Sequence, residues 1–418
     1  MKDVLGRDEL ITVDEALERL LSLPLKTTET ESIGIEELAH KRILSRDITS
    51  HEDLPGFDRS TMDGYAVNSA DTFGATESAP AYLELTGEVT MGCRPGFSLN
   101  RGSAAQIPTG GMLPEGADSV VMYEHTNRVG DDTVEIFKSV APGENIIRRD
   151  EDVKKEEVIL RRGHRLRPQD IGALAGLGVS KIHVFKQPVV SLISTGNEIV
   201  PPEVTPSPGQ VRDINSFNLF GLIRENGGIP VKKGIISDEI EKLRAVVSKS
   251  LRESDMVIIT GGSSVGTRDY AAKIIAEFGS PGILFHGVAI KPGKPIIGAL
   301  VKGIPVFGLP GHPAAVTVSF MIFVKPVLSR LSGEAPRAEL ADIKKVKAVF
   351  SRNLSSSIGR EEHIRVYLEH VNGTLRAVPI LGKSGLIKTL VKSDGLVKIP
   401  YEKNGLYEGE EVEVMVFS

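Results

Sequence analysis

The segment from residue 188 to residue 330 alternates between apolar runs of strand length and amphipathic runs of helix length. The strand-like runs are PVVSLIST, VKKGIIS, DMVIIT, GILFHGVAI, IIGAL and IPVFGLP, and the first four alternate with NSFNLFGLIRENGG, DEIEKLRAVVSKSLRES and DYAAKIIAEFG. We expect Asn215 to cap the first of these helices and a capping box of Asp238 with Glu241 to open the second. Strands that alternate with helices form mostly parallel sheets with helices packed on their faces. The pattern therefore predicts a three-layer α/β domain, followed by a last helix from about Pro313.

The segments on either side of this one have β character. Residues 81–140 contain short alternating runs such as YLELTGEV, with Asp131-Asp132 as the expected hairpin tip. Residues 336–418 return to short β runs such as HIRVYLEHV and EVEVMVFS, which are typical of a small β-barrel or sandwich. One helix is predicted after a capping box of Thr12 with Glu15, and a second in RPQDIGALAGLG. The chain is thus expected to be a multidomain α/β plus β protein.

Composition excludes several classes of function. At 418 residues the chain is too long for one core, and its net charge of -5 gives no support to a nucleic-acid-binding surface. The single cysteine, Cys93, forms no internal disulfide and no cysteine-based metal site, which fits a reducing, cytoplasmic setting. The apolar run Ala314 to Val324 is too short to span a bilayer, so we expect no membrane association.

Polar residues follow the predicted strands of the α/β segment, where ligands bind in parallel sheets. The polar residues are Glu198, Asp213, Asn215, Asp269, Lys291, Lys294 and His312, and the same loops contain Gly261, Gly266, Pro310 and Gly311. Each has a structural alternative: Asp213, Asn215 and Asp269 can cap helices, KPGKP can be a tight turn, and His312 can simply start a helix. Glu198 has no obvious capping duty. The convergence of several such loops on one sheet edge favours a binding site.

The loop TGGSSVGTRDY places Gly261 and Gly266 at the spacing of a phosphate-binding P-loop. Thr267 stands where that motif needs lysine, and Arg268 where it needs a hydroxyl. The loop can still form a nest of backbone N–H groups for an anion, with lysines supplied by KPGKP. The carboxylates are hard ligands suited to Mg²⁺ shared with phosphate. This set favours binding and electrostatics at a phosphate over nucleophilic catalysis.

Three loops outside the α/β segment hold further polar residues, each with an ordinary turn or a solvated connector as its alternative reading. They are FDRSTMDGYAV with Asp58 and Asp63, IPTGGMLPEGADSVVM with Thr109, and GENIIRRDEDV with Asp150 and Asp152. In order along the chain, these loops and STGNEI, DINS, TGGSSVGTRDY, IKPGKP and GLPGHPAA resemble the molybdopterin molybdenumtransferases, relatives of the C-terminal domain of gephyrin. The match runs from the first helix to the C-terminus.

The resemblance implies four parts. They are an elongated dimerisation domain (1–47 and 141–183), an inserted β domain (48–140), a three-layer α/β molybdopterin-binding domain (184–332) and a C-terminal β-barrel (333–418). It also implies a homodimer whose cleft lies between the α/β domain of one subunit and the elongated and inserted domains of the other. Asp63, Thr109 and Asp152 would then face the loop TGGSSVGTRDY (the glycine loop) of the partner subunit.

The resemblance further implies a Mg²⁺-dependent reaction of adenylylated molybdopterin with molybdate or tungstate, in which AMP is released. Glu198, Asp213 and Asp269 would bind Mg²⁺ and act catalytically, and Asp63 and Asp152 would complete the acidic cleft. The substrate-binding residues would be Thr109, Gly261, Gly262, Ser263, Gly266, Lys291, Lys294, Pro310, Gly311 and Ser384.

The sequence departs from the family pattern at five places. Arg59 and Thr61 replace the commoner Asn and Ala, Asn197 replaces a frequent Asp, Gly287 stands where some members have a lysine, and His312 replaces the usual Asn. Two other functions remain as alternatives: a peptide-binding scaffold of the gephyrin type, and a molybdopterin adenylyltransferase. The retained carboxylates and lysines favour the molybdenumtransferase.

Overall fold

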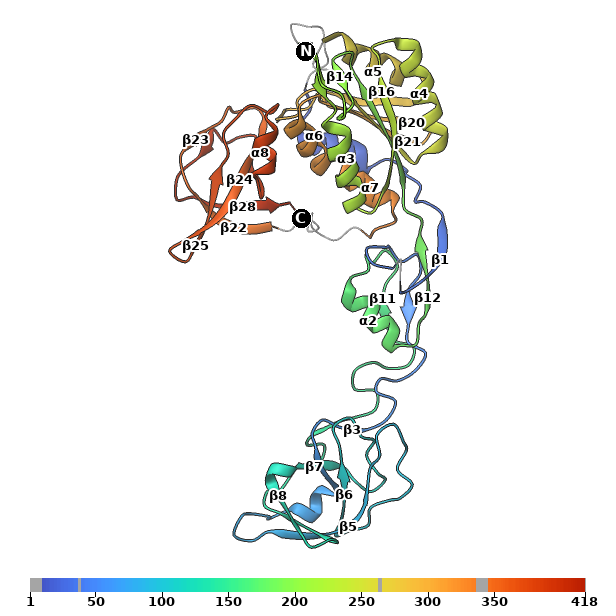
Figure 1. Ribbon diagram of the computed structural model, residues 1–418, viewed down its shortest axis with the longest axis vertical. Coiled ribbons are helices and arrows are strands. Elements are labelled where there is room, and N and C mark those ends of the chain that lie inside the picture. The colour runs from blue at the N-terminus through green and yellow to red at the C-terminus, as the bar shows by residue number, and fades with distance from the viewer. Residues whose placement is uncertain (1–9, 37–38, 262–264, 336–344, 418) are drawn as a thin grey trace. The chain divides into compact units, whose positions relative to one another are not determined.

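The structure is a computed structural model that describes residues 10–36, 39–261, 265–335 and 345–417, with only the backbone described for residues 265–269 (Figure 1). The chain forms two compact units. Unit 1 comprises residues 1–46, 162–168 and 181–418, and unit 2 comprises residues 47–161 and 169–180. The four-part division expected from the sequence has different boundaries and stays a prediction.

A six-stranded sheet forms the centre of unit 1, in the order β16-β13-β17-β21-β20-β18. Its strands are β13 (Val189–Thr195), β16 (Ile229–Ile236), β17 (Met256–Gly261), β18 (Pro281–His286), β20 (Ile297–Val301) and β21 (Ile304–Leu309). The pairs β16-β13, β13-β17 and β17-β21 are parallel, whereas β20 is antiparallel to both β21 and β18. Because β18 and β21 are both antiparallel to β20, they run in the same direction. β18 therefore ends at the same edge of the sheet as the parallel strands.

Helices cover both faces of this sheet, as the alternating sequence predicts. The helices are α1 (Val13–Leu21), α3 (Asn215–Glu225), α4 (Ile240–Glu253), α5 (Val265–Glu277), α6 (Pro313–Ser319), the π-helical turn η3 (Phe320–Val324) and α7 (Lys325–Leu331). Leu192 and Ile258 pack with α1, α3, α6 and α7, whereas Ile193 and Ile259 pack with α4 and α5. Successive strand residues therefore enter opposite cores. The three-layer α/β fold is confirmed.

Two local predictions for these helices have different outcomes. The Thr12–Glu15 capping box is present: the Glu15 backbone N–H donates to Thr12 Oγ1 at 3.2 Å, and the Thr12 N–H donates to Glu15 Oε2 at 2.8 Å. The Asp238–Glu241 box was wrong, because α4 begins at Ile240 after Glu239, with no side-chain hydrogen bond at that cap.

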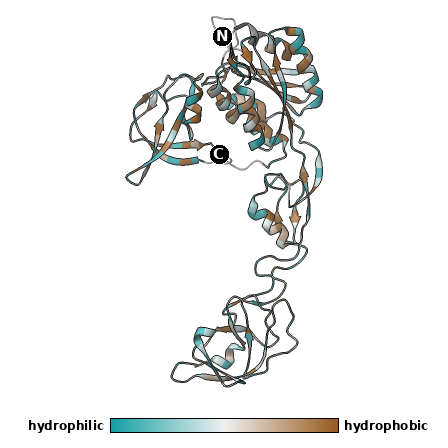
Figure 2. Cartoon of the chain, viewed as in Figure 1, coloured by the Kyte–Doolittle hydropathy of each residue, from teal (hydrophilic) through white to brown (hydrophobic). Residues whose placement is uncertain are grey.

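The apolar helix is longer than the sequence reading suggested. α6, η3 and α7 run on as one stretch from Pro313 to Leu331, long and apolar enough by composition to cross a membrane. However, 72% of its most apolar window is buried inside the protein, and Figure 2 shows mostly hydrophobic colouring on these helices. Burial, rather than shortness, marks this stretch as a core helix.

The C-terminal part of unit 1 is a closed β-barrel. Its strands follow one another as β24 (Glu361–Val371), β25 (Thr374–Pro379), β22 (Lys345–Phe350), β28 (Glu411–Val416) and β26 (Gly395–Ile399), and β26 pairs back with β24. The short strands β23 (Leu354–Ser355) and β27 (Gly405–Leu406) and helix α8 (Ile387–Val391) flank it. Between barrel and sheet, β19 (Ile290–Lys291) pairs in parallel with β24. The barrel, expected as one of two β forms, is confirmed.

Unit 1 also contains an antiparallel pair of β1 (Thr30–Gly34) with β12 (Lys181–Phe185) and a parallel pair of β14 (Ile199–Val200) with β15 (Val211–Arg212). Unit 2 is built on the sheet β7-β4-β6-β5-β9-β8. Its elements are β2 (Ile48–Thr49), β3 (Arg59–Ser60), β4 (Gly64–Val67), η1 (Ser69–Thr72), β5 (Ala81–Glu88), β6 (Ser103–Ile107), β7 (Ser119–Met122), η2 (Tyr123–His125), β8 (Thr126–Val129), β9 (Thr133–Ile136), β10 (Ile146–Ile147), β11 (Val158–Leu160) and α2 (Pro168–Gly176). The hairpin predicted at Asp131-Asp132 joins β8 to β9.

Candidate functional site

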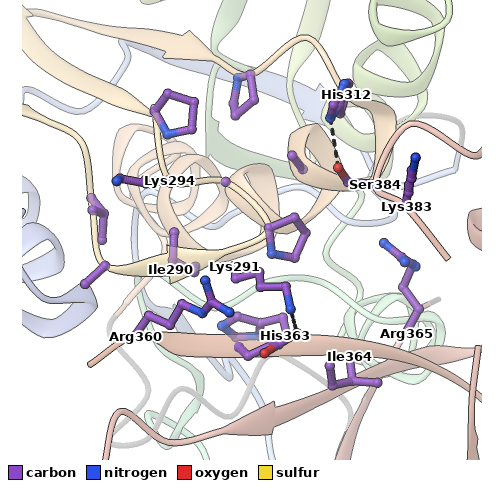
Figure 3. Close-up of a pocket in the computed structure, with 18 of the residues that line it drawn as sticks. Ile290, Lys291, Lys294, His312, Arg360, His363, Ile364, Arg365, Lys383 and Ser384 are labelled. Atoms are coloured by element: carbon purple, nitrogen blue, oxygen red, sulfur yellow. Dashed lines mark hydrogen bonds and ion pairs between the residues drawn. The ribbon is translucent and has the colours of Figure 1, made fainter. Parts of the chain in front are cut away.

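A cavity of about 800 Å³ lies between the KPGKP loop, the turn before α6 and strand β24 of the barrel (Figure 3). Its lining is rich in cationic side chains. We call it the cationic pocket and define it by Lys291, Lys294, Arg360, Arg365 and Lys383. Polar donors from three separate segments of unit 1 thus surround one space.

The parallel pairing of β19 with β24 brings the first lysine to the barrel. In this register Lys291 lies opposite Glu362, and its Nζ is 2.6 Å from Glu362 Oε1. Glu362 is 5% exposed, and its other carboxylate oxygen accepts a hydrogen bond of 2.7 Å from Ser356 Oγ. This buried carboxylate therefore holds the ammonium group at the rim of the pocket.

Arg365 and Arg360 present guanidinium groups to the same pocket. Arg365 is 7% exposed and donates from Nη2 to the carbonyl oxygen of Gly382 at 2.9 Å. The Nε atoms of both arginines are buried and have no hydrogen-bond partner among the described residues. Burial lowers the pKa of Arg365 below its usual value. Burying a positive charge and leaving an N–H donor without a partner both cost free energy. An anion in the pocket would balance the charge and accept the hydrogen bond.

Ser384 is fixed in this pocket by the turn that precedes α6. His312 Nδ1 lies 2.8 Å from Ser384 Oγ, and the Ala314 backbone N–H donates to the Ser384 carbonyl oxygen at 3.1 Å. His312 occupies the position before α6, but its side chain makes no capping hydrogen bond. The ring is directed instead toward Ser384, as Figure 3 shows.

A second group of polar residues lies where β13 and β16 end; we call Glu198, Asp213 and Asp238 the carboxylate edge. Gly196 has a φ of +142°, and a Cβ at this position would lie 2.6 Å from Glu198 Oε2, so the glutamate carboxylate folds back over the glycine. The Asn197 N–H donates to Asp238 Oδ2 at 3.4 Å, and the Asp238 N–H donates to Asn197 Oδ1 at 3.1 Å. Burial, reinforced by the charge of Glu198 and opposed by the Asn197 N–H, raises the pKa of Asp238.

Asp213 caps the first turn of α3, which is the structural role that the sequence offered as an alternative. Its Oδ1 accepts from the Ser216 N–H at 3.0 Å and its Oδ2 accepts from Ser194 Oγ at 2.8 Å. Asn215, expected to be the cap, instead donates to Thr260 Oγ1 at 3.2 Å and to the Gly311 carbonyl oxygen at 2.8 Å. Asp213 also lines a cavity of about 550 Å³.

The Asn215 amide therefore joins the end of β17 to the turn that borders the cationic pocket. The strand ends themselves are tightly packed, since a Cβ on Gly261 would lie 1.8 Å from Thr195 Oγ1. Pro295 of the KPGKP loop contacts the same small cavity as Thr195 and Gly261. The glycine loop and the KPGKP loop thus start from one sheet edge, although Lys291 itself is paired to the barrel.

Unit 2 gathers the three loops with unexplained polar residues. β3 pairs with β10, and the Thr61 N–H donates to the Asn145 carbonyl oxygen at 2.9 Å, which joins FDRSTMDGYAV to GENIIRRDEDV. The Thr109 N–H donates to Asp63 Oδ1 at 2.7 Å. Asp63 and Asp152 are both exposed. The structure brings Asp63 and Thr109 into contact and places Asp152 on an adjoining loop.

The expected site residues fall into four groups. Lys291, Lys294, Pro310, Gly311 and Ser384 line the cationic pocket. Glu198 and Asp213 belong to the carboxylate edge, and Asp63, Thr109 and Asp152 belong to unit 2. Gly261 ends β17, and the backbones of Gly266 and Asp269 lie in α5. Gly262 and Ser263 lie outside the described residues, as does the side chain of Asp269.

The metal set of Glu198, Asp213 and Asp269 is therefore described only in part. Within the described part of the chain, no three His, Cys, Asp or Glu side chains are close enough together to hold a metal ion. The assignment stays a prediction.

Sequence reasoning missed four polar residues of these sites: Arg360, Arg365, Lys383 and Asp238. Arg365 lies in HIRVYLEHV, which is predicted to be a barrel strand, and Asp238 is predicted to open a helix. A signal was present for the arginines: GREEHIR carries four charged residues and a histidine at the start of a strand that must enter a core.

Comparison with known families covers most of the chain. Residues 11–178 match the MoeA N-terminal region (domains I and II), residues 191–330 match a probable molybdopterin binding domain, and residues 347–417 match the MoeA C-terminal region (domain IV).

Individual relatives agree over nearly the whole length. A putative molybdopterin biosynthesis protein of Methanocaldococcus jannaschii is 37% identical over 384 residues, which is 90% of this chain and 89% of that protein. The molybdopterin molybdenumtransferase of Bacillus subtilis is 33% identical over 411 residues, covering 97% and 94% of the two chains. The crystal structure of the molybdopterin biosynthesis MoeA protein of Pyrococcus horikoshii superposes with a TM-score of 0.81 at 34% identity, covering 98% of this chain and all of that one. The chain therefore belongs to the molybdopterin molybdenumtransferase (MoeA) family.

Proposed function

We propose that this protein is a molybdopterin molybdenumtransferase that inserts molybdate, or tungstate, into adenylylated molybdopterin with release of AMP. The observation that carries the proposal is the cationic pocket. The cavity is lined by three lysines, a serine hydroxyl and two arginines whose Nε atoms have no partner in the described part of the chain.

The chemistry of the pocket suits a tetrahedral dianion. Lys294 and Lys383 are exposed, and their charges can be shared with a small oxyanion without a large desolvation cost. The Nε and remaining guanidinium N–H groups of Arg365 are fixed donors for oxyanion oxygens. Phosphate and sulfate share this tetrahedral shape, so selectivity for molybdate is to be measured against them.

Two of the three proposed metal ligands, Glu198 and Asp213, lie at the carboxylate edge, and carboxylate oxygens are ligands that Mg²⁺ prefers. The described carboxylates of this edge are not close enough together to hold a metal ion by themselves, so the proposed site depends on Asp269 as a third ligand. We propose that Glu198, Asp213 and Asp269 hold Mg²⁺, which when bound would supply charge neutralisation at the phosphoanhydride. Asp213 is oriented for this role by Ser194 and Ser216.

We further propose a homodimer in the cytoplasm, in which Asp63, Thr109 and Asp152 serve the carboxylate edge of the partner subunit. The support is the exposure of Asp63 and Asp152 together with the family relationship. Oligomeric enzymes with shared sites show complementation between inactive variants. Asp63→Asn and Asp213→Asn should each be inactive alone, and random reassembly of equal amounts should restore about a quarter of the activity, since about half the dimers carry one intact site.

The activity is tested with purified protein, adenylylated molybdopterin, Mg²⁺ and molybdate, following AMP by chromatography and molybdenum bound to the pterin. AMP release should require Mg²⁺ and should be lost in Asp213→Asn. AMP transfer from ATP to molybdopterin instead of AMP release would identify an adenylyltransferase. Full activity of Asp213→Asn would contradict the assignment of the carboxylate edge.

A further inference from the structure

His312 lines the cationic pocket, and the proposed function assigns it no role. It lies in the GLPGHPAA turn, and its Nδ1 is 2.8 Å from Ser384 Oγ. It lines the same cavity as Lys294, Arg365 and Lys383 (Figure 3). We infer that His312 is an oxyanion-binding residue that, when protonated, turns the Ser384 hydroxyl into a donor for the bound anion.

The hydrogen-bond arithmetic of the pair supports this inference. When Nδ1 of a neutral imidazole is unprotonated, it accepts the single Ser384 hydroxyl proton, and Oγ then offers only lone pairs to the pocket. Once Nδ1 is protonated, it donates to Oγ and the hydroxyl proton is free to reach an oxyanion. The Ser384 backbone is held by the Ala314 N–H, so the hydroxyl turns without moving the loop.

Protonation also adds a positive charge to the pocket. An asparagine at this position could hydrogen-bond Ser384 but could not change charge, so the histidine gives this protein a pH dependence that a His312→Asn variant would lack. The inference rests on the proposed oxyanion role of the cationic pocket and adds a residue to it.

Other charged groups line the same cavity, and their contribution to the pH dependence has to be distinguished from that of His312. Lys291, Lys294 and Lys383 come from loops, and Arg360, Glu362, His363 and Arg365 come from β24 and its start. Lysine, arginine and glutamate ordinarily change charge outside the range of about pH 6 to pH 8. His363 is 2% exposed and its Nε2 lies 2.7 Å from Glu361 Oε1, so it is the competing histidine.

The test is equilibrium dialysis of the full-length protein against low-micromolar molybdate at about pH 6 and pH 8, with the bound molybdenum measured by mass spectrometry. The wild type should bind at least about tenfold more tightly at the lower pH, because a hydrogen bond to a charged group and a new positive charge are both gained. His312→Asn should bind with little pH dependence. His370→Asn, at an exposed position of β24 outside the pocket, is the matched control and should behave as the wild type.

Three results would overturn the inference. An equal pH dependence in the wild type and His312→Asn would assign the titration to another group, such as His363, and would leave the oxyanion pocket intact. Binding without pH dependence in the wild type would also overturn the role of His312 alone. Absence of molybdate binding at every pH would remove the oxyanion pocket itself, and with it this part of the proposed function. As a second readout, the titration midpoint of the His312 NMR signal should move to higher pH when molybdate is bound.

Discussion

Replacing Arg365 by methionine separates binding from stability in the cationic pocket. The guanidinium is 7% exposed, and it has one hydrogen bond, to the Gly382 carbonyl oxygen, together with an unpartnered Nε among the described residues. Methionine fills a similar volume without charge. It removes the donors proposed for the oxyanion, and each hydrogen bond to a charged group is worth about 1.5–3 kcal/mol. Molybdate affinity should therefore fall by a factor of about 10 to 150.

The stability of the ligand-free protein should change in the opposite direction or hardly at all. Methionine loses the hydrogen bond to Gly382, worth about 1 kcal/mol, but it also removes a buried charge. The thermal midpoint without ligand should thus be equal to or above that of the wild type. A hundredfold excess of molybdate over its dissociation constant should stabilise the wild type by about 2.7 kcal/mol, and the same concentration should stabilise Arg365→Met far less.

The assay is thermal unfolding with and without molybdate, combined with calorimetric titration. Arg376→Met is the matched control, because Arg376 is exposed on the neighbouring strand β25 and does not line the cavity. Unchanged molybdate affinity in Arg365→Met would refute the reasoning. So would a large loss of stability without ligand, since it would show that the arginine is held for structure.

Two further predictions concern the carboxylate edge and unit 2. The pKa of Asp238 is raised, chiefly by burial and also by the charge of Glu198. The folded state therefore binds this proton more tightly than the unfolded state does. As a result, the free energy of unfolding falls as the pH rises above the ordinary aspartate pKa of about 3.9. Asp238→Asn should therefore raise the thermal midpoint near neutral pH and leave it unchanged near pH 4; a lower midpoint near neutral pH would contradict this. A Cβ on Gly64 would lie 2.0 Å from the Val121 carbonyl oxygen, so Gly64→Ala should destabilise unit 2 by about 1–3 kcal/mol or more in chemical denaturation. Gly96→Ala, where a Cβ meets nothing within 4 Å, should be near neutral; equal effects of the two substitutions would contradict the steric argument.

Local signals predicted much of the fold from the sequence. The Thr12–Glu15 box opens α1 as expected, and the apolar run PVVSLIST forms the buried strand β13. Such features depend only on residues that are close together in the sequence. The capping box at Asp238 failed because a non-local partner, Asn197, lies within hydrogen-bond distance of the aspartate.

The cationic pocket depends on contacts that a sequence pattern does not contain. Lys291 meets Glu362 because β19 joins the barrel in parallel register, a pairing between segments about seventy residues apart. Lys291, Lys294 and Ser384 could be singled out by resemblance, but Arg365 could be recognised only once β24 was placed beside the KPGKP loop. Sequence reasoning thus found Lys291 and Lys294 but missed Lys383 and Arg365, which is the more buried of the two pocket arginines.

The most direct measurement is a crystal structure of the protein soaked with molybdate, with diffraction recorded on both sides of the molybdenum absorption edge. The anomalous signal locates the metal without reference to any assignment of residues. We predict a peak in the cationic pocket, with oxyanion oxygens within hydrogen-bond distance of Arg365, Lys294 and Ser384. A peak at another site, with this pocket containing no anomalous signal at saturating molybdate, would contradict the account.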